Sequence, residues 1–158
     1  IPLLRQQGLR VSVVKHAHHR FDIDHPGKDS WRHRQAGAGE VLIANSHRLA
    51  LMREFSEPRE LEPHALIAEL SPCDWVLVEG FKHGDLPKVE VWRAAPDGPG
   101  RAPLYPQDPR VVAVATDAPD RLPVPPAVPV LDLNEPAALV QYLLASGERC
   151  LYHPPHHG

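Results

Sequence analysis

The chain has 158 residues, a length that fits one globular domain with a single hydrophobic core. Its 17 Lys and Arg residues against 20 Asp and Glu residues give a formal charge of −3, which excludes a general electrostatic attraction to nucleic acid. Cys73 and Cys150 form no CxxC pair, and no apolar segment approaches the roughly 20 residues of a membrane helix. We therefore expect a reduced, cytoplasmic protein that spans no membrane.

The first half of the chain predicts helices and short strands in alternation. In chain order these are a helix at 1–7, a strand at 11–14, a helix at 29–36, strands at 40–44 and 48–53, and a helix within 58–70. Gly8 is placed to close the first helix, and Asp29 or Ser30 to cap the second. The tight connection between the two strands allows them to form a hairpin.

The second half continues the alternation. It contains apolar segments typical of strands at 75–78, 88–92, 111–115 and 128–131, and a final helix that Asn134 would cap and that runs to Ser146. Apolar strands between amphipathic helices predict an α/β fold with a mainly parallel sheet flanked by helices. We expect one domain over residues 1–147 and a His- and Pro-rich tail over residues 148–158.

Polar residues follow three of the predicted strands, and ligands of parallel sheets bind outside the carboxyl ends of the strands. The first polar segment, residues 15–30, is dense in histidine, carboxylate and lysine. Asp22 and Asp24 could offer oxygen ligands to Mg²⁺, and Lys15 and Lys28 could meet phosphate oxygens. The alternative is a solvated loop with no ligand.

The histidines of this segment also allow a zinc site. His16, His18 and His19 could supply imidazole ligands, but neither cysteine lies near them in sequence, and structural zinc sites usually include thiolates or regular spacing. Zinc therefore remains the weaker interpretation of the segment.

The second and third strand ends carry single residues of interest. Glu79 and Gly80 follow four apolar residues, as in a Walker B element, where an acid holds Mg²⁺ or its water and a glycine lies against the terminal phosphate. Asp117 could accept two hydrogen bonds from the N1 and N2 groups of guanine. Each pattern also occurs without a ligand: strands commonly end in Glu-Gly, and Asp117 could be a turn residue.

Four segments, taken in order, resemble the MobB family of molybdopterin-guanine dinucleotide biosynthesis proteins. They are KHAHHRFDIDHPGKDS at 15–30, RQAGA at 34–38, WVLVEGFKH at 75–83 and VVAVATD at 111–117. The resemblance implies a P-loop NTPase-like fold, GTP and Mg²⁺ as ligands with weak or no hydrolysis, and a homodimer. It also implies a supporting role beside the guanylyltransferase MobA in forming molybdopterin guanine dinucleotide or in delivering it to a target molybdoenzyme.

On the matching positions, the resemblance makes Asp22, Asp24 and Glu79 candidate ligands of Mg²⁺ or its water. Gly80 becomes a phosphate-sensing position and Asp117 a guanine contact, while Lys15 and Lys28 match the polar loop. No catalytic residue is assigned.

The family opens with a strand and a Gly-x-x-x-x-Gly-Lys-Thr/Ser loop that do not occur in these 158 residues. We expect both to precede Ile1, and we expect residues 1–158 alone to bind GTP poorly, because the loop holds the β- and γ-phosphates. Two other classes stay open: an active GTPase or phosphotransferase, and a histidine-rich metal carrier.

Overall fold

The computed structural model describes residues 1–17, 21–96, 98 and 100–155. Its elements in chain order are α1 (Pro2–Gln6), β1 (Val11–Lys15), α2 (Asp29–Gln35), β2 (Glu40–Ala44), β3 (Leu49–Arg53), α3 (Pro63–Ala68), β4 (Trp75–Glu79), β5 (Lys88–Trp92), β6 (Val111–Thr116), β7 (Val130–Asp132) and α4 (Pro136–Ala145), with 3₁₀ turns at Pro119–Arg121 and Gly147–Cys150. Every strand and helix expected from the sequence is present.

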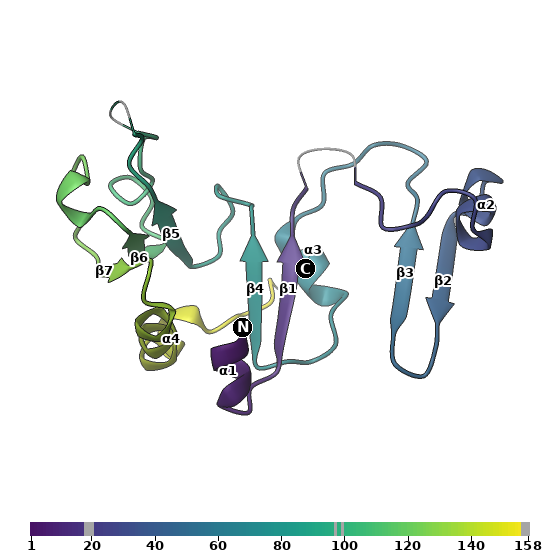
Figure 1. Ribbon diagram of the computed structural model, residues 1–158, viewed down its shortest axis with the longest axis horizontal. Helices are drawn as coiled ribbons and strands as arrows, with labels where there is room; N and C mark the ends of the chain where they lie inside the picture. The colour runs from purple at the N-terminus through teal and green to yellow at the C-terminus, as the bar shows by residue number, and fades with distance from the viewer. Residues whose placement is uncertain (18–20, 97, 99, 156–158) are drawn as a thin grey trace.

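The parallel strands lie in two sheets flanked by helices, which confirms the α/β class. β1 pairs with β4, and β6 lies between β5 and β7; all three pairings are parallel. Within the described residues, β4 and β5 each have a ladder partner on one edge only. Figure 1 shows the β5–β6–β7 sheet on the side of β4 away from β1, with β5 as its nearest strand.

The main hydrophobic core belongs to the β5–β6–β7 sheet. Trp92, Tyr105, Val111 and Val114 form one buried cluster, because β6 is apolar over residues 111–115 and has a strand on each side. Glu90 of β5 is a buried carboxylate that accepts hydrogen bonds from the backbone N–H groups of residues 104 and 105 at 2.8–2.9 Å. These bonds satisfy the buried carboxylate and attach the proline-rich connection between β5 and β6 to the sheet.

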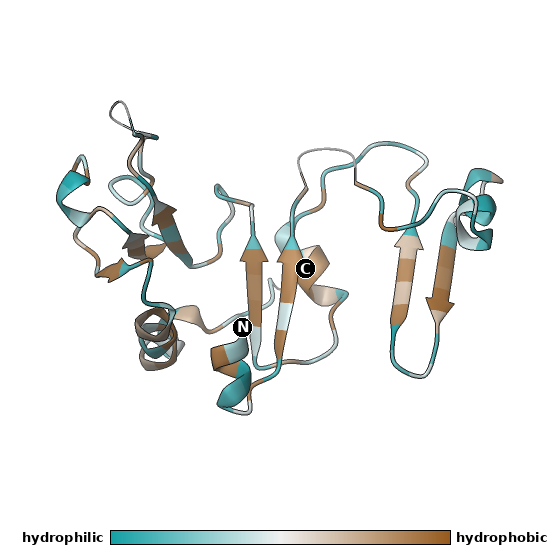
Figure 2. Cartoon of the chain, in the orientation of Figure 1, coloured by the Kyte–Doolittle hydropathy of each residue, from teal (hydrophilic) through white to brown (hydrophobic). Residues whose placement is uncertain are grey.

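The second and third strands form the expected hairpin, which projects from the rest of the chain with α2 beside it (Figure 1). In the antiparallel register Leu42 lies opposite Leu51, and Ala44 opposite Leu49, so three leucines share one face. Their exposed fractions are 58%, 40% and 63% for Leu42, Leu51 and Leu49, respectively. Figure 2 shows the apolar character of both strands. The hairpin therefore presents an uncovered apolar face.

α3 lies within the predicted range and begins at Pro63, which confirms the expectation that this proline is tolerated in the first turn, where its missing N–H costs nothing. The predicted N-caps of the other two helices were wrong. Lys28, with no side-chain cap, occupies the N-cap position expected for Asp29 or Ser30. α4 begins at Pro136 with Glu135 at the N-cap, while the backbone N–H of Asn134 donates to Asp132.

The C-terminal segment returns to the body of the molecule. Tyr152 Oη lies 3.0 Å from His64 Nδ1 of α3, and His64 Nε2 lies 2.8 Å from Asp85 Oδ1. The tail is thus joined through one imidazole to the segment that follows β4. Among the described residues, no helix has the length and apolar character needed to cross a membrane.

Candidate functional site

The carboxyl ends of β1 and β4 bring two of the predicted residues together. The parallel register sets Lys15 opposite Glu79, and Lys15 Nζ lies 2.8 Å from Glu79 Oε1. Both side chains are about two-thirds exposed. The next residue, His16, extends the ladder, because its backbone N–H donates to the Glu79 carbonyl at 2.9 Å. A cation, a carboxylate and an imidazole therefore meet at one edge.

Gly80 follows directly and has a conformation that other residues rarely adopt. Its φ is +94°, and a Cβ built on it would lie 2.8 Å from the Cβ of His16. Both observations require glycine at this position. Phe81 then has a φ of +50°, the one positive value among the described non-glycine residues. Two consecutive left-handed residues thus turn the chain sharply away from β4, a strained geometry that clusters at functional sites.

His16 and Phe81 pack against each other across this turn, with ring centroids 4.7 Å apart and ring planes tilted by 40°. The Phe81 carbonyl accepts the backbone N–H of Gly84 at 2.8 Å, which closes the turn. The zinc interpretation gains no support here: within residues 1–17, 21–96, 98 and 100–155, no three His, Cys, Asp or Glu residues form a cluster able to hold a metal ion. His18 and His19 lie outside the described residues.

Asp22 and Asp24 do not gather with Glu79; Arg34 of α2 holds them instead. Arg34 Nη1 lies 2.9 Å from Asp22 Oδ1 and 3.4 Å from Asp24 Oδ2, and Arg34 Nε lies 2.7 Å from Glu54 Oε1. The side chains of Arg34 and Asp24 are only 14% and 6% exposed. Ser30 Oγ also donates to Asp24 Oδ1 at 2.8 Å. The two aspartates thus join their loop to α2 and to the end of β3.

The ionisation of this cluster follows from its hydrogen bonds. The pKa of Asp22 is lowered, first by the backbone N–H of Asp24 and then by Arg34. Burial works against the charged form of Asp24, but hydrogen bonds from Ser30, the His25 backbone and Arg34 outweigh it and lower its pKa. Glu54 and then Asp22 raise the pKa of Arg34 further above its ordinary value. The carboxylates are therefore charged at neutral pH and already have a cation.

Asp117 and Lys28 occupy separate places. Asp117 follows β6, and its Oδ2 lies 2.6 Å from Nη1 of Arg93, which follows β5. Lys28 is the exposed N-cap of α2. The described structure therefore brings Lys15, Glu79 and Gly80 together and leaves Asp22 with Asp24, Lys28 and Asp117 apart from them.

Sequence reasoning missed several residues of this region. Arg34 could have been found from helical spacing, because Ser30 and Arg34 are four residues apart on α2 and share a face. The contacts of Phe81 with His16 and of Arg93 with Asp117 join segments far apart in the chain, and no local pattern indicates them.

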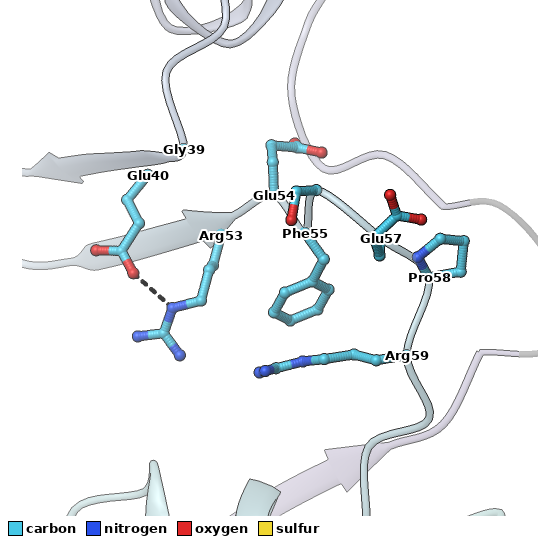
Figure 3. A pocket seen from close by; sticks show the side chains of 9 residues that line it. Gly39, Glu40, Arg53, Glu54, Phe55, Glu57, Pro58 and Arg59 are labelled. Atoms are coloured by element: carbon cyan, nitrogen blue, oxygen red, sulfur yellow. Dashed lines mark hydrogen bonds and ion pairs between the residues drawn. The ribbon is translucent and has the colours of Figure 1, made fainter.

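A shallow hollow at the base of the β2–β3 hairpin is lined by residues other than those of the β1–β4 edge. In Figure 3, Arg53 points toward Glu40, and Arg53 Nε lies 2.5 Å from Glu40 Oε1. The Arg59 guanidinium lies over the Phe55 ring, 4.1 Å from its centroid. A second carboxylate, that of Glu69, lies 3.0 Å from Arg53. None of the residues predicted to bind a ligand lines this hollow.

Comparison with known proteins decides the family. The family model described as "Molybdopterin guanine dinucleotide synthesis protein B" matches residues 1–117. The chain belongs to the MobB family. It is similar to the molybdopterin-guanine dinucleotide biosynthesis adapter protein of Escherichia coli K12, with 39% identity over 147 residues, covering 91% of this chain and 80% of that protein.

Two further relatives agree. The protein of the same name from Haemophilus influenzae is 42% identical over 119 residues, which cover 75% of this chain and 65% of the relative. A crystal structure of molybdopterin-guanine biosynthesis protein B superposes with a TM-score of 0.64 at 28% identity, covering 91% of this chain and 85% of that one. The chain is thus a MobB-family protein with a mixed α/β fold, in a family of molybdenum cofactor biosynthesis.

We expect Gly80→Ala to lower the free energy of unfolding by about 2 kcal/mol, because the new Cβ combines a left-handed φ with the contact to His16. Gly39→Ala is the matched control, since no atom lies within 4 Å of its added Cβ, and it should cost less than about 0.5 kcal/mol. Urea denaturation measures both. Adding His16→Gly to Gly80→Ala should recover part of the lost stability, because it removes the Cβ that the new side chain meets. If the stability losses of the two substitutions simply add, the contact between positions 16 and 80 is contradicted.

We expect Arg34→Gln to lower the melting temperature at pH 7 more than Arg32→Gln, its exposed neighbour on α2. The native pKa values of Asp22 and Asp24 lie below the unfolded value of about 3.9. The stability that Arg34 contributes through these ion pairs is therefore fully present above that pH. It is lost as the pH falls through the lowered values. Thermal denaturation from pH 7 to pH 2 should show the difference shrinking; a pH-independent difference would rule out the charge pairing.

Proposed function

We propose that this chain is a GTP-binding adapter in the formation or delivery of molybdopterin guanine dinucleotide and that it binds Mg²⁺·GTP at the carboxyl edge of β1 and β4. The observation that supports this best is the convergence of Lys15, Glu79 and the left-handed Gly80 at one edge. A lysine can meet phosphate oxygens, and a glycine without Cβ lets the backbone come close to a phosphate. The family membership supports the same ligand.

Mg²⁺ fits this edge if it is held chiefly by the nucleotide and water, because it usually takes only one or two protein carboxylates. Glu79 is the carboxylate that pairs with Lys15 at this edge and is proposed as a ligand of the ion or its water, and Lys15 would exchange its carboxylate partner for phosphate. Asp22 and Asp24 are proposed as further ligands of the ion or its water. To serve, they must exchange Arg34 for the metal, since Arg34 binds both of them.

For the base we propose Asp117. Arg93 binds its Oδ2, so a guanine would approach through Oδ1. Lys28, exposed at the start of α2, is proposed as a second phosphate contact. A parallel strand between the single-partner edges of β4 and β5 would join the two sheets and carry the phosphate-binding loop of the family.

As partners we propose the guanylyltransferase MobA together with molybdopterin, or a molybdoenzyme that receives the finished cofactor. The relatives named above are called adapter proteins. We propose a cytoplasmic location, in agreement with two free thiols, Cys73 and Cys150.

The full-length protein, with any residues that precede Ile1, should bind GTP with Mg²⁺ and hydrolyse it negligibly without a partner. Asp117→Asn should weaken GTP about tenfold and leave ATP unchanged, because the charged carboxylate that would accept from the guanine N–H groups is lost. Calorimetry with both nucleotides and a phosphate-release assay measure this.

Asp120→Asn, three residues further along and exposed, is the control and should change neither affinity. Equal losses for GTP and ATP would remove Asp117 from base recognition. Hydrolysis of many GTP per protein each minute would replace the adapter with an enzyme, and absence of GTP binding would refute the proposal.

We also propose that the chain forms a homodimer through the leucine face of the β2–β3 hairpin, defined by Leu42, Leu49 and Leu51. An isolated two-stranded hairpin is marginal in water, and apolar surface of this kind favours association with a second apolar face.

Leu42→Lys should convert the dimer to a monomer at micromolar concentration, because a buried unpaired ammonium opposes association. Analytical ultracentrifugation gives the mass. Leu151→Lys is the matched control, since Leu151 is 63% exposed, close to the 58% of Leu42, but lies outside the hairpin. A monomeric wild type, or a dimer that tolerates Leu42→Lys, would contradict this arrangement.

A further inference from the structure

The turn formed by Gly80 and Phe81 is strained and cannot be maintained by its own residues. Gly80 adopts its φ of +94° without a steric penalty, but Phe81 at +50° is a bulky side chain in a region that disfavours it. Such a conformation persists only where the surrounding structure enforces it. The contacts around the turn therefore identify what holds it.

One contact comes from within the segment after β4. The N–H of Gly84 donates to the Phe81 carbonyl at 2.8 Å. This fixes one side of the turn only. The other side faces the neighbouring strand.

His16, the residue that follows β1, supplies the second side. Its Cβ is the atom that a Cβ on Gly80 would meet at 2.8 Å, and its ring packs on Phe81 at 4.7 Å between centroids. Its backbone N–H donates to the Glu79 carbonyl, immediately before the turn. His16 therefore lies against Glu79, Gly80 and Phe81, and it directly follows Lys15 in the chain.

We infer that His16 is a positioning residue that holds the Gly80–Phe81 turn in place and thereby sets the preference of the site for a nucleoside triphosphate over a diphosphate. This rests on the proposed binding of GTP at this edge. A turn held in one geometry presents its backbone to a terminal phosphate without reorganising, whereas a diphosphate has no group at that position and gains nothing from it. In this proposal the His16 ring acts through its packing against Phe81.

The test measures the dissociation constants of Mg²⁺·GTP and Mg²⁺·GDP for the full-length protein. His16→Ala should weaken GTP about fivefold or more and change GDP less than about twofold. His16→Phe keeps a ring against Phe81 and should retain most of the wild-type preference. His83→Ala, an exposed histidine two residues beyond Phe81, is the matched control and should behave as wild type.

Phe81→Leu removes the ring contact from the other side and should reproduce the His16→Ala loss, which keeps the test decisive if His16→Ala fails to fold. An unchanged GTP-to-GDP ratio in both variants, or equal wild-type affinities, overturns the inference. A His16→Phe variant as defective as His16→Ala also overturns it, because the imidazole would then act by its own chemistry.

Failure of the wild type to bind GTP refutes the proposed function instead. Amide hydrogen exchange, measured without nucleotide, then decides whether His16 holds the Gly80–Phe81 turn in place. Faster exchange around Gly80 and Gly84 in His16→Ala than in His83→Ala supports the contact as the structural determinant of the turn. Unchanged exchange overturns it.

Discussion

The parallel pairing of β1 with β4 is the constraint on which the candidate site depends. Its register sets Lys15 opposite Glu79 and delivers His16 to the position beside Gly80. A register shift by one residue would move every side chain of β1 to the other face of the sheet, separating these groups. The ion pair, the glycine requirement and the strained Phe81 thus follow from one set of backbone hydrogen bonds.

Most residues proposed to bind nucleotide or metal already have a partner of opposite charge. Lys15 binds Glu79, Arg34 binds both aspartates of the polar loop, and Arg93 binds Asp117. A ligand bound at these positions would therefore exchange one ion pair for another. Its affinity would depend on the difference between the two ion pairs.

Stability and exposure are distributed unevenly along the chain. The β5–β6–β7 sheet buries an apolar central strand and satisfies the buried Glu90, whereas the β2–β3 hairpin leaves Leu42, Leu49 and Leu51 in solvent. The hairpin is joined to the polar loop through Arg34, whose guanidinium contacts Glu54 at the end of β3. A partner that covers the hairpin would thus act on a segment directly connected to the candidate ligand loop.

The sequence by itself determined the order and type of the elements, the parallel pairing class, and three of the residues that meet at the β1–β4 edge. Hydrophobic periodicity and strand ends are local properties, so Glu79 and Gly80 were visible as a pair. Only the tertiary structure decided that Arg34 binds Asp22 and Asp24, that Arg93 faces Asp117, and that His16 lies against Gly80. The latter two contacts join distant segments and depend on side-chain geometry that no local pattern specifies, whereas the four-residue spacing of Ser30 and Arg34 on α2 could have indicated Arg34. The physical reason is that sheet register and side-chain packing, which create the site, are set by long-range contacts.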